Sequence, residues 1–355
     1  MHRKRINDMA QRSSGSLAQG IKEYFLPLKK DSRNEKLRKI IFLFSVVVFI
    51  ISLVQLGLFL KDKGTEEGYL KEMQELAPTL ADAPAQPAQP SAQQNGSAAA
   101  PAPEVRELQP WANKLLGKNK DVVGWLSIPT HTDSKGDPFI NTAVVKGKDN
   151  KEYLYLNLDK KYSISGTLFA DSRCTLEKDK TSDNVTIYGH HMGYIGTGLT
   201  HIHEYKQGVD FLKKNPVIVF NSLYDSTNQK YAIVGCFISN ITEASDNGTL
   251  FRYWGAADFS EKDTNFNEWI TEVRKRSWYS SNINCTEKDK YITLSTCSDE
   301  CFGIRWVIVA KKLTAQDDLD KIVDSYKAKA DGDIYFPAVW KNKLGNKKVY
   351  YGWDF

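Results

Sequence analysis

The sequence predicts a mostly β protein, a closed β-barrel of about seven to eight strands with inserted helices, preceded by a transmembrane helix and a linker. Three observations carry this prediction. Residues 40–60 form an uncharged apolar run, residues 77–103 are rich in Pro, Ala, Gln and Ser, and the rest of the chain holds short β-like runs. Because these runs do not alternate regularly with helical segments, they indicate a barrel rather than a doubly wound sheet.

The apolar run begins at Ile40 and ends at Leu60, between Lys39 and Lys61. Its 21 residues carry no charge and show no polar stripe, and about 20 apolar residues are enough to span a bilayer. A cleaved signal peptide is the rival interpretation. The 39 residues before the run make an unusually long n-region, however, and no A-x-A cleavage site follows closely. The sequence therefore favours an uncleaved signal anchor in the membrane.

The charge of the chain is unevenly distributed. Residues 1–39 carry eleven basic and four acidic side chains, whereas the other 316 residues sum to a net charge of −2. Basic flanks stay in the cytoplasm, so we expect a single-pass protein of the cell membrane with a cytoplasmic N-terminus and the bulk of the chain on the extracellular side. Because the basic excess belongs to this tail, the sequence gives little support to nucleic-acid binding by the main domain.

Residues 61–104 are expected to form an extracellular stalk. Residues 66–76 predict a short helix, and residues 77–103 hold six of the twelve prolines and almost no large apolar side chain. Such a composition cannot form a core and favours an extended chain, which at about 3.1 Å per residue would span on the order of 80 Å. The stalk would lift the following domain off the membrane.

The globular part of the chain begins near residue 105. Short runs rich in β-branched and aromatic residues, bounded by Gly, Asn, Asp and Pro, predict its strands. They cover residues 122–128, 142–145, 166–170, 184–188, 217–220, 231–239, 291–295 and 305–310. Helices are expected over residues 107–116, 200–212 and 259–277, the last because its apolar side chains recur at near-helical spacing.

Three side chains at predicted strand ends suggest chemistry. Cys297 follows the strand 291–295, Arg305 begins the next strand, and His190 follows the strand 184–188. A nearby cation favours a thiolate and can hold an oxyanion, and a histidine can move the proton, so the three together suit acyl transfer through a thioester. Taken singly, each has an ordinary interpretation as a buried cysteine, a structural histidine or an edge charge.

The other four cysteines, Cys174, Cys236, Cys285 and Cys301, leave several alternatives open. Disulfides can form outside the cell, and an odd total leaves a free thiol. Cys301 might pair reversibly with Cys297, although nothing in the sequence fixes the loop geometry. No set of Cys and His side chains has a common zinc spacing, so no metal is expected. The run HIHE at residues 201–204 is interpreted as a surface feature at a helix start rather than as a metal site.

The sequence motifs around the three candidate residues resemble those of the sortases, the membrane-anchored cysteine transpeptidases of Gram-positive bacteria. YGHHM contains His190, and TLSTC ends at Cys297 and matches the TLxTC box of that family, with Arg305 eight residues later. NKEYLYLNLDKKYSISGTLFADSR (150–173) and DFSEKDTNFNEWITEVRKRSWYSS (258–281) are similar to segments of class B members. The resemblance covers about residues 105–312 and implies the sortase β-barrel.

The resemblance implies a role for each candidate residue. Cys297 would be the nucleophile, His190 the general acid that protonates the leaving amine, and Arg305 the group that positions substrate and stabilises the oxyanion. His191 occupies a variable position of the family and is given no catalytic role. The residues expected to line the substrate groove are Ser295, Thr296, Asn150 and Leu154. The family implies no cofactor.

The implied reaction cuts a C-terminal sorting motif of the Asn-Pro-x-Thr kind after its Thr. The partners would be secreted proteins with such sorting signals, and an amine from a peptidoglycan precursor or a pilin lysine would resolve the thioester. Anchoring of surface proteins to the cell wall and pilus assembly both stay open. The expected layout is a cytoplasmic tail (1–39), the membrane anchor (40–60), the stalk (61–104), the catalytic domain (105–312) and an extension of unknown role (313–355), which we expect to pack on the barrel.

Two other functions compete with this one. A hydrolytic cysteine peptidase of the papain type would place Cys before His, whereas here His190 precedes Cys297 by 107 residues. A sortase-shaped protein that only binds surface proteins or pilins would need no complete set of catalytic side chains. The presence of Cys297, His190 and Arg305 argues against that second alternative.

Overall fold

The structure is a computed structural model, and it describes residues 22, 24–81, 106–193, 195–255, 257–259 and 265–352. The chain divides into two compact units, Met1–Thr65 and Glu66–Phe355. The predicted stalk residues 82–104 lie outside the described part, as does most of the predicted cytoplasmic tail.

Helix α2 (Arg33–Gln74) contains the predicted membrane segment and is longer than it at both ends. Among the described residues it is the one helix long and apolar enough to cross a membrane, and none of its most apolar window is buried. The large side chains of this window, including Phe44 and Phe49, are exposed to a degree that water would not favour. The helix therefore fits a single N-terminal membrane anchor.

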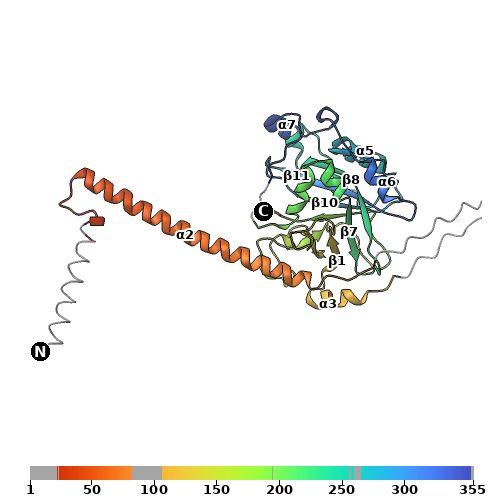
Figure 1. The fold of residues 1–355 in the computed structure, drawn as a ribbon, viewed down its shortest axis with the longest axis horizontal. Coiled ribbons are helices and arrows are strands. Elements are labelled where there is room, and N and C mark those ends of the chain that lie inside the picture. Colours follow the sequence, from red (N-terminus) through yellow and green to blue (C-terminus); the bar gives the residue numbers. More distant parts are fainter. Residues whose placement is uncertain are drawn as a thin grey trace, which may run out of the picture. The chain divides into compact units, whose positions relative to one another are not determined.

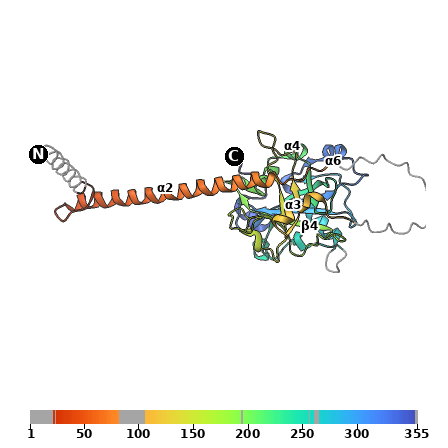
Figure 2. The same cartoon turned by 90° about the horizontal axis from the view of Figure 1, so that it is seen from below.

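The second unit is built on a closed barrel of eight strands in the order β1-β2-β3-β4-β10-β11-β8-β7. Figure 1 shows the barrel in the second unit, and Figure 2 shows the same unit from below. The predicted mostly β barrel with inserted helices is confirmed. Its strands are β1 (Val122–Ser127), β2 (Asn141–Val145), β3 (Leu168–Ala170), β4 (Asn184–Tyr188), β7 (Val217–Ser222), β8 (Lys230–Asn240), β10 (Tyr291–Cys297) and β11 (Ile304–Lys312).

Closure of the barrel depends on parallel and antiparallel pairs. β10 runs parallel to β4 and antiparallel to β11, and β2 runs parallel to β3. Parallel neighbours need long crossover connections. The connection from β4 to β10 contains β7 and β8 together with several short helices and short strands. β4 and β10 thus end at the same edge of the barrel.

The insertions are mostly short helices. They are α3 (Pro110–Lys118), η1 (Glu152–Leu154), η2 (Thr200–Lys206), α4 (Val209–Lys214), η3 (Glu243–Asp246), η4 (Tyr253–Gly255) and α5 (Phe266–Arg276), with the small strand pairs β5 (His191–Met192) with β6 (Thr197–Gly198) and β9 (Tyr279–Ser280) with β12 (Lys327–Ala328). The single helix predicted over 200–212 is two helices, because Gly208 between them has a φ of 149°. α5 begins late, at the cap Asn265, whose side chain accepts hydrogen bonds from two backbone N–H groups.

Residues 66–76 of the predicted stalk belong to the second unit. Glu66 is buried and its carboxylate accepts hydrogen bonds from the Ser163 hydroxyl at 2.9 and 3.0 Å. The Tyr69 hydroxyl accepts a hydrogen bond from Leu158 N–H at 2.7 Å, and Met73 is buried in a core cluster with residues of β1 and β2. The helix expected over 66–76 is present as the end of α2, and the residues that it packs against are distant in the sequence.

The C-terminal extension completes the main core. It contains α6 (Leu319–Ser325), β12, η5 (Asp331–Asp333) and α7 (Ala338–Leu344). Phe336 and Trp340 are fully buried and pack with Trp278 at ring-centroid distances of 6.3 Å each. The packing expected of this extension is therefore present, and it is deep rather than superficial.

Candidate active site

Cys297 and Arg305 face one another across a strand pair. Cys297 is the last residue of β10, and its partner in the antiparallel register with β11 is Arg305. Directly opposite side chains on such a pair have Cβ atoms about 4.5–5.5 Å apart. Cys297 is half-buried, and so is Arg305. The strand pairing thus places the two residues side by side, and Arg305 Nη1 donates to the backbone oxygen of Ile304 at 3.3 Å.

His190 reaches the same edge from the other side of β10. The parallel register pairs Ser295 with Tyr188, so the positions two residues further on are those of Cys297 and His190. Thr296 Oγ1 donates a hydrogen bond to Gly189 O at 2.8 Å, which extends this adjacency beyond the ladder. β4, β10 and β11 therefore bring the three predicted catalytic side chains to one end of the barrel. Their catalytic roles stay predictions.

The His190 ring is oriented by the segment before β3. Its Nε2 lies 2.8 Å from the backbone oxygen of Leu154, which fixes Nε2 as the hydrogen-bond donor. The ring of Tyr155 lies 5.4 Å from the His190 ring, centroid to centroid. His190 is half-buried, so part of the residue is accessible at the edge.

The four predicted groove residues differ in what they contact. Ser295 is buried, and its hydroxyl lies 2.7 Å from the hydroxyl of Tyr253. Thr296 is also buried, and its hydroxyl donates to the backbone oxygen of Gly189. Leu154 holds His190 through its backbone oxygen. Their role in binding substrate stays a prediction.

Asn150 is engaged inside the fold. Its amide N–H₂ donates to the Asp171 carboxylate at 3.1 Å and its amide oxygen accepts from Ser172 N–H at 2.7 Å. Asp171 also accepts from the hydroxyl of Tyr188, the last residue of β4, at 2.8 Å. Burial acts against ionisation here, but the hydrogen bonds from Arg173 and Tyr188 lower the pKa of Asp171 overall. Asn150 is thus tied to the strand that leads to His190.

Tyr253 belongs to the site although the sequence does not single it out. Its side chain is buried, and burial raises its pKa to about 12, so the hydroxyl stays protonated. It comes from η4, a single turn between β8 and α5. The only signal in the sequence is the aromatic pair Tyr253 and Trp254, which does not indicate a contact with Ser295.

A buried polar cluster lies behind the loop that joins β10 to β11. We use this name for His191, His203, Lys206, Ser298 and Glu300. Within it, His203 Nε2 donates to the backbone oxygen of Cys297 at 2.8 Å. The His203 and His191 rings stack with centroids 4.0 Å apart. Burial lowers the pKa of both imidazoles, so both rings are neutral near pH 7.

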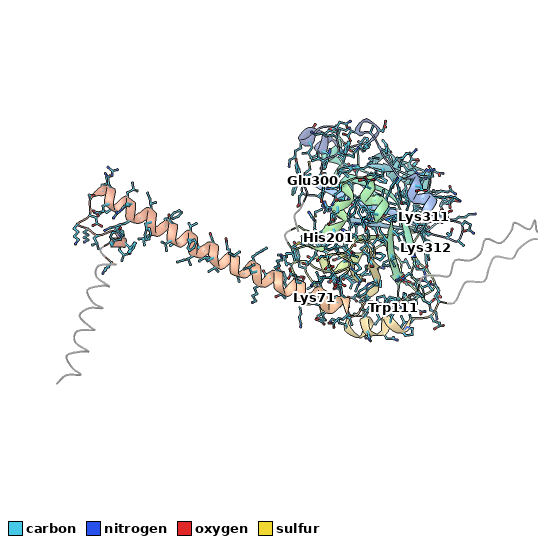
Figure 3. The ribbon with its side chains drawn as sticks, in the orientation of Figure 1. Lys71, Trp111, His201, Glu300, Lys311 and Lys312 are labelled. Atoms are coloured by element: carbon cyan, nitrogen blue, oxygen red, sulfur yellow. The ribbon has the colours of Figure 1, made fainter. Side chains whose placement is uncertain are left out.

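Lys206 and Glu300 form the ionic part of this cluster. Lys206 Nζ lies 2.5 Å from a carboxylate oxygen of Glu300 and 3.0 Å from Ser298 Oγ, and Ser298 also bonds to Glu300. Burial lowers the pKa of Lys206 to about 8, against the opposing effect of Glu300. Glu300 is labelled on the second unit in Figure 3. The ion pair thus joins Lys206 of η2 to Glu300 in the loop that follows Cys297.

The neighbours His190 and His191 have different surroundings. The ring of His190 lies at the edge, whereas the side chain of His191 is 1% exposed and lies 3.1 Å from the Asp299 carboxylate. The interpretation of HIHE as a surface feature is wrong, because His201 and His203 are both buried. Such a run is short and polar, and only the packing of η2 against the barrel makes it internal.

None of the five cysteines forms a disulfide. Cys301, the candidate partner of Cys297, is buried, and its thiol lies 3.9 Å from the backbone oxygen of Val339 in α7. Burial raises the pKa of the Cys301 thiol. Cys174 and Cys236 are also buried, so their thiols behave as small apolar groups.

Comparisons with known proteins place this geometry in context. No model of a known protein family matches the chain. The chain is 31% identical over 207 residues to sortase B of Staphylococcus aureus, across 58% of this chain and 75% of that protein. It is 33% identical over 198 residues to sortase B of Listeria monocytogenes, across 56% of this chain and 68% of that protein.

A solved structure shares the fold. The crystal structure of a Bacillus anthracis protein described as similar to sortase B superposes with a TM-score of 0.50 at 21% identity. The match covers 70% of this chain and 98% of that one. The barrel and its inserted helices thus have a counterpart that was determined by experiment.

Proposed function

Since this chain belongs to the sortase B family, we propose that it is a membrane-anchored cysteine transpeptidase with Cys297 as its nucleophile. The observation that carries the proposal is the cross-strand pairing of Cys297 with Arg305 at the edge where β4 delivers His190. Its substrates are secreted proteins with a C-terminal sorting motif of the Asn-Pro-x-Thr kind. The acceptor is an amine of a peptidoglycan precursor or a pilin lysine.

The first half of the reaction forms a thioester. The Cys297 thiolate attacks the carbonyl carbon of the motif Thr, and the carbonyl oxygen becomes an oxyanion beside the Arg305 guanidinium. Charged donors fixed in place before the reaction stabilise such an oxyanion. His190 then gives its proton to the leaving amine, the peptide C–N bond breaks, and the acyl group stays on sulfur.

The second half reverses the roles of these groups. An incoming amine attacks the thioester carbonyl, His190 takes a proton from it, and the C–S bond breaks to release Cys297 as a thiolate. The new amide joins the surface protein to its acceptor. Leu154 holds the His190 ring in place through both halves, since its backbone oxygen accepts from Nε2.

The location of the enzyme follows from α2. We propose that residues 40–60 span the cell membrane, with the basic N-terminal tail in the cytoplasm and the barrel on the extracellular side. The single apolar helix of the described residues supports an anchor of this kind. An enzyme tethered there meets its substrates as they leave the membrane.

The test is mass spectrometry of the full chain in detergent with Asn-Pro-x-Thr and Leu-Pro-x-Thr peptides, with and without triglycine. We expect cleavage after Thr, an acyl adduct on Cys297 and transfer to the amine. Cys297→Ala should abolish all three. The matched control is Cys285→Ala, which removes a half-buried thiol in the connection before β10 and should leave them unchanged.

Other outcomes would contradict the proposal in different ways. Cleavage by water alone, undiminished by triglycine, would identify a hydrolytic cysteine peptidase. Peptide binding without an adduct, unchanged in Cys297→Ala, would identify a scaffold that binds surface proteins. An adduct on a cysteine other than Cys297 would overturn the assignment of the nucleophile.

A further inference from the structure

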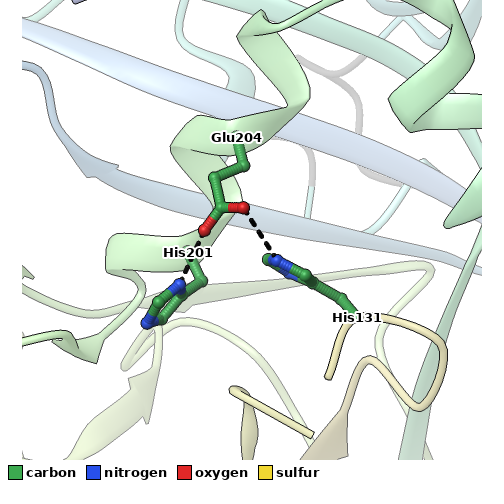
Figure 4. Close-up of side chains that lie close together, drawn as sticks. All are labelled: His131, His201 and Glu204. Atoms are coloured by element: carbon green, nitrogen blue, oxygen red, sulfur yellow. Dashed lines mark hydrogen bonds and ion pairs between the residues drawn. The ribbon is translucent and has the colours of Figure 1, made fainter. Parts of the chain in front are cut away.

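A second cluster of chemically active side chains lies outside the site described above. It joins His131, from the connection between β1 and β2, to His201 and Glu204 of η2. Figure 4 shows the Glu204 carboxylate between the two rings. One carboxylate oxygen lies 3.0 Å from His131 Nε2 and the other lies 2.7 Å from His201 Nδ1. The three ligand atoms all lie within 4.8 Å of one another.

The cluster is held in place by packing. His131 is 5% exposed and His201 is 3% exposed. The Phe139 ring stacks on His201 with centroids 3.9 Å apart, and the Phe211 ring meets His131 edge-on at 5.0 Å. The aromatic contacts pack both imidazoles in positions where one ring nitrogen of each faces the Glu204 carboxylate. Preorganised ligands of this kind favour binding of an ion.

The polar contacts of His131 add a second observation. Its Nδ1 is buried and has no hydrogen-bond partner within the described segments of the chain. Glu204 is therefore the polar group that holds this ring, through Nε2. A buried polar atom without a hydrogen bond lowers the stability of the fold, so His131 is a costly residue if its role is packing alone.

The donor set indicates the class of ion. Two imidazole nitrogens and one carboxylate oxygen suit zinc and its first-row neighbours, whereas calcium and magnesium prefer oxygen alone. Glu204 supplies the negatively charged ligand of the three. Metal–ligand bonds of about 2.0–2.2 Å at tetrahedral angles put ligand atoms about 3.3 Å apart. The carboxylate oxygens of Glu204 already lie within that distance of the two imidazole nitrogens, at 3.0 and 2.7 Å.

We propose that His131, His201 and Glu204 bind a divalent transition-metal ion of the zinc class, with the fourth position open to water. The ion would join the connection between β1 and β2 to η2. η2 also carries His203, which donates to the backbone oxygen of Cys297. The same short helix therefore carries two of the proposed ligands and the hydrogen bond to the Cys297 backbone. The proposed metal site does not depend on the reaction proposed above.

The test uses the full chain in detergent with Cys297→Ala as the background, so that the exposed thiol cannot take metal. The protein is stripped with a chelator, dialysed against Zn²⁺ and analysed for bound metal, and Co²⁺ is added in a parallel spectroscopic titration. We expect a single bound Zn²⁺ per chain. The Co²⁺ complex should show tetrahedral visible bands without the thiolate charge-transfer band of a cysteine ligand.

Three variants locate the ion. His201→Ala and Glu204→Gln should each remove at least nine-tenths of the bound zinc, and the glutamine keeps the size of the side chain that it replaces. His190→Ala is the matched control, because it removes a histidine of the proposed active site, outside this cluster, and should leave zinc binding unchanged. Zn²⁺ should also raise the Tm of the background protein and leave that of Glu204→Gln unchanged, since a ligand stabilises only the state that binds it.

The proposal is overturned by any of three results. The first is that the stripped, folded protein binds no Zn²⁺, which would show that the cluster is held by hydrogen bonds alone. Zinc binding might survive in Glu204→Gln, or the Co²⁺ spectrum might show a thiolate ligand, and either would place the metal elsewhere. If His201→Ala fails to fold, Glu204→Gln with its Tm measurement decides alone.

Discussion

The two sides of the β10–β11 loop are built in opposite ways. On the open side, Cys297 and Arg305 stand on regular strands and are half-buried. On the inner side, Lys206 and Glu300 are buried and belong to a polar cluster in which a hydrogen bond also reaches the backbone of Cys297. Strand geometry places the reacting groups, and a buried polar cluster holds the loop between them.

This difference separates reactivity from rigidity. The side chains that meet substrate need few internal partners, because each one must be free to contact the substrate. Behind them, the two buried charges of Lys206 and Glu300 are paired, since an unpaired buried charge would be costly. Substitutions on the inner side should therefore change stability first, and substitutions on the open side should change rate first.

The largest effect is expected when the buried ion pair is broken. Lys206→Met leaves the Glu300 carboxylate buried without its cation, and removing one partner of a buried pair costs about 3–5 kcal/mol. We expect a large fall in the Tm of the full chain in detergent, measured by thermal unfolding. Lys321→Met is the matched control, because its pair with Asp318 is exposed and such pairs contribute about 0–1 kcal/mol.

A double substitution sharpens the same comparison. Lys206→Met with Glu300→Leu removes both charges, and apolar replacements of a whole buried pair are often neutral. The double variant should therefore recover most of the lost Tm. If it is as unstable as Lys206→Met alone, the loss comes from packing of the lysine stem and the ionic account is wrong.

A smaller effect, and one on rate, is expected at Arg305. Arg305→Ala should lower kcat/KM for transpeptidation by about 10²–10³-fold, the usual loss on removal of an oxyanion donor. The Tm should change little because the side chain is half-buried at a strand end. Peptide cleavage assays measure the loss, and Arg252→Ala, at an exposed ion pair, serves as the control.

Charge alone should not restore this activity. Arg305→Lys keeps the cation but lacks the planar fork of donors, so its rate should lie between those of the alanine variant and the parent. Equal rates for Arg305→Lys and the parent would show that the guanidinium geometry is not used, and a collapse of Tm in either variant would contradict the separation of rate from stability.

The smallest effect is expected at His203, where the two sides meet. His203→Ala removes one hydrogen bond to the Cys297 backbone, worth about 1 kcal/mol, or roughly fivefold in kcat if it is lost in the transition state. His203→Gln retains a donor and should restore much of the rate. If alanine and glutamine variants have the same kcat and differ only in Tm, His203 supports the fold and does not position the nucleophile.

Much of the barrel could be predicted because its strands carry local signals. The run 184–188 is predicted to the residue, and 291–295 and 305–310 fall inside β10 and β11. Adjacent strands joined by a short loop fix which residues face one another, so the meeting of Cys297 and Arg305 could be predicted too. The parallel pairing of β4 with β10 involves residues more than a hundred positions apart, and only the family resemblance pointed to it.

Other features depend on packing that no local pattern encodes. His190 and His191 are neighbours in sequence, and which of them reaches the edge is decided by the turn after β4. The HIHE run becomes internal because η2 packs on the barrel. The same holds for Glu66, whose burial depends on a hydroxyl 97 residues away. The cluster of His131 with Glu204 likewise joins segments that are distant in the chain.

The deep burial of Phe336 and Trp340 has a consequence for the timing of folding. Both side chains belong to the main core, yet they are made within the last twenty residues of a chain of 355. During synthesis, every strand of the barrel is complete before these two rings become available. Until they are made, Trp278 lacks two of its aromatic neighbours. A chain that stops before Phe336 would carry Cys297, His190 and Arg305 but would lack this part of the core.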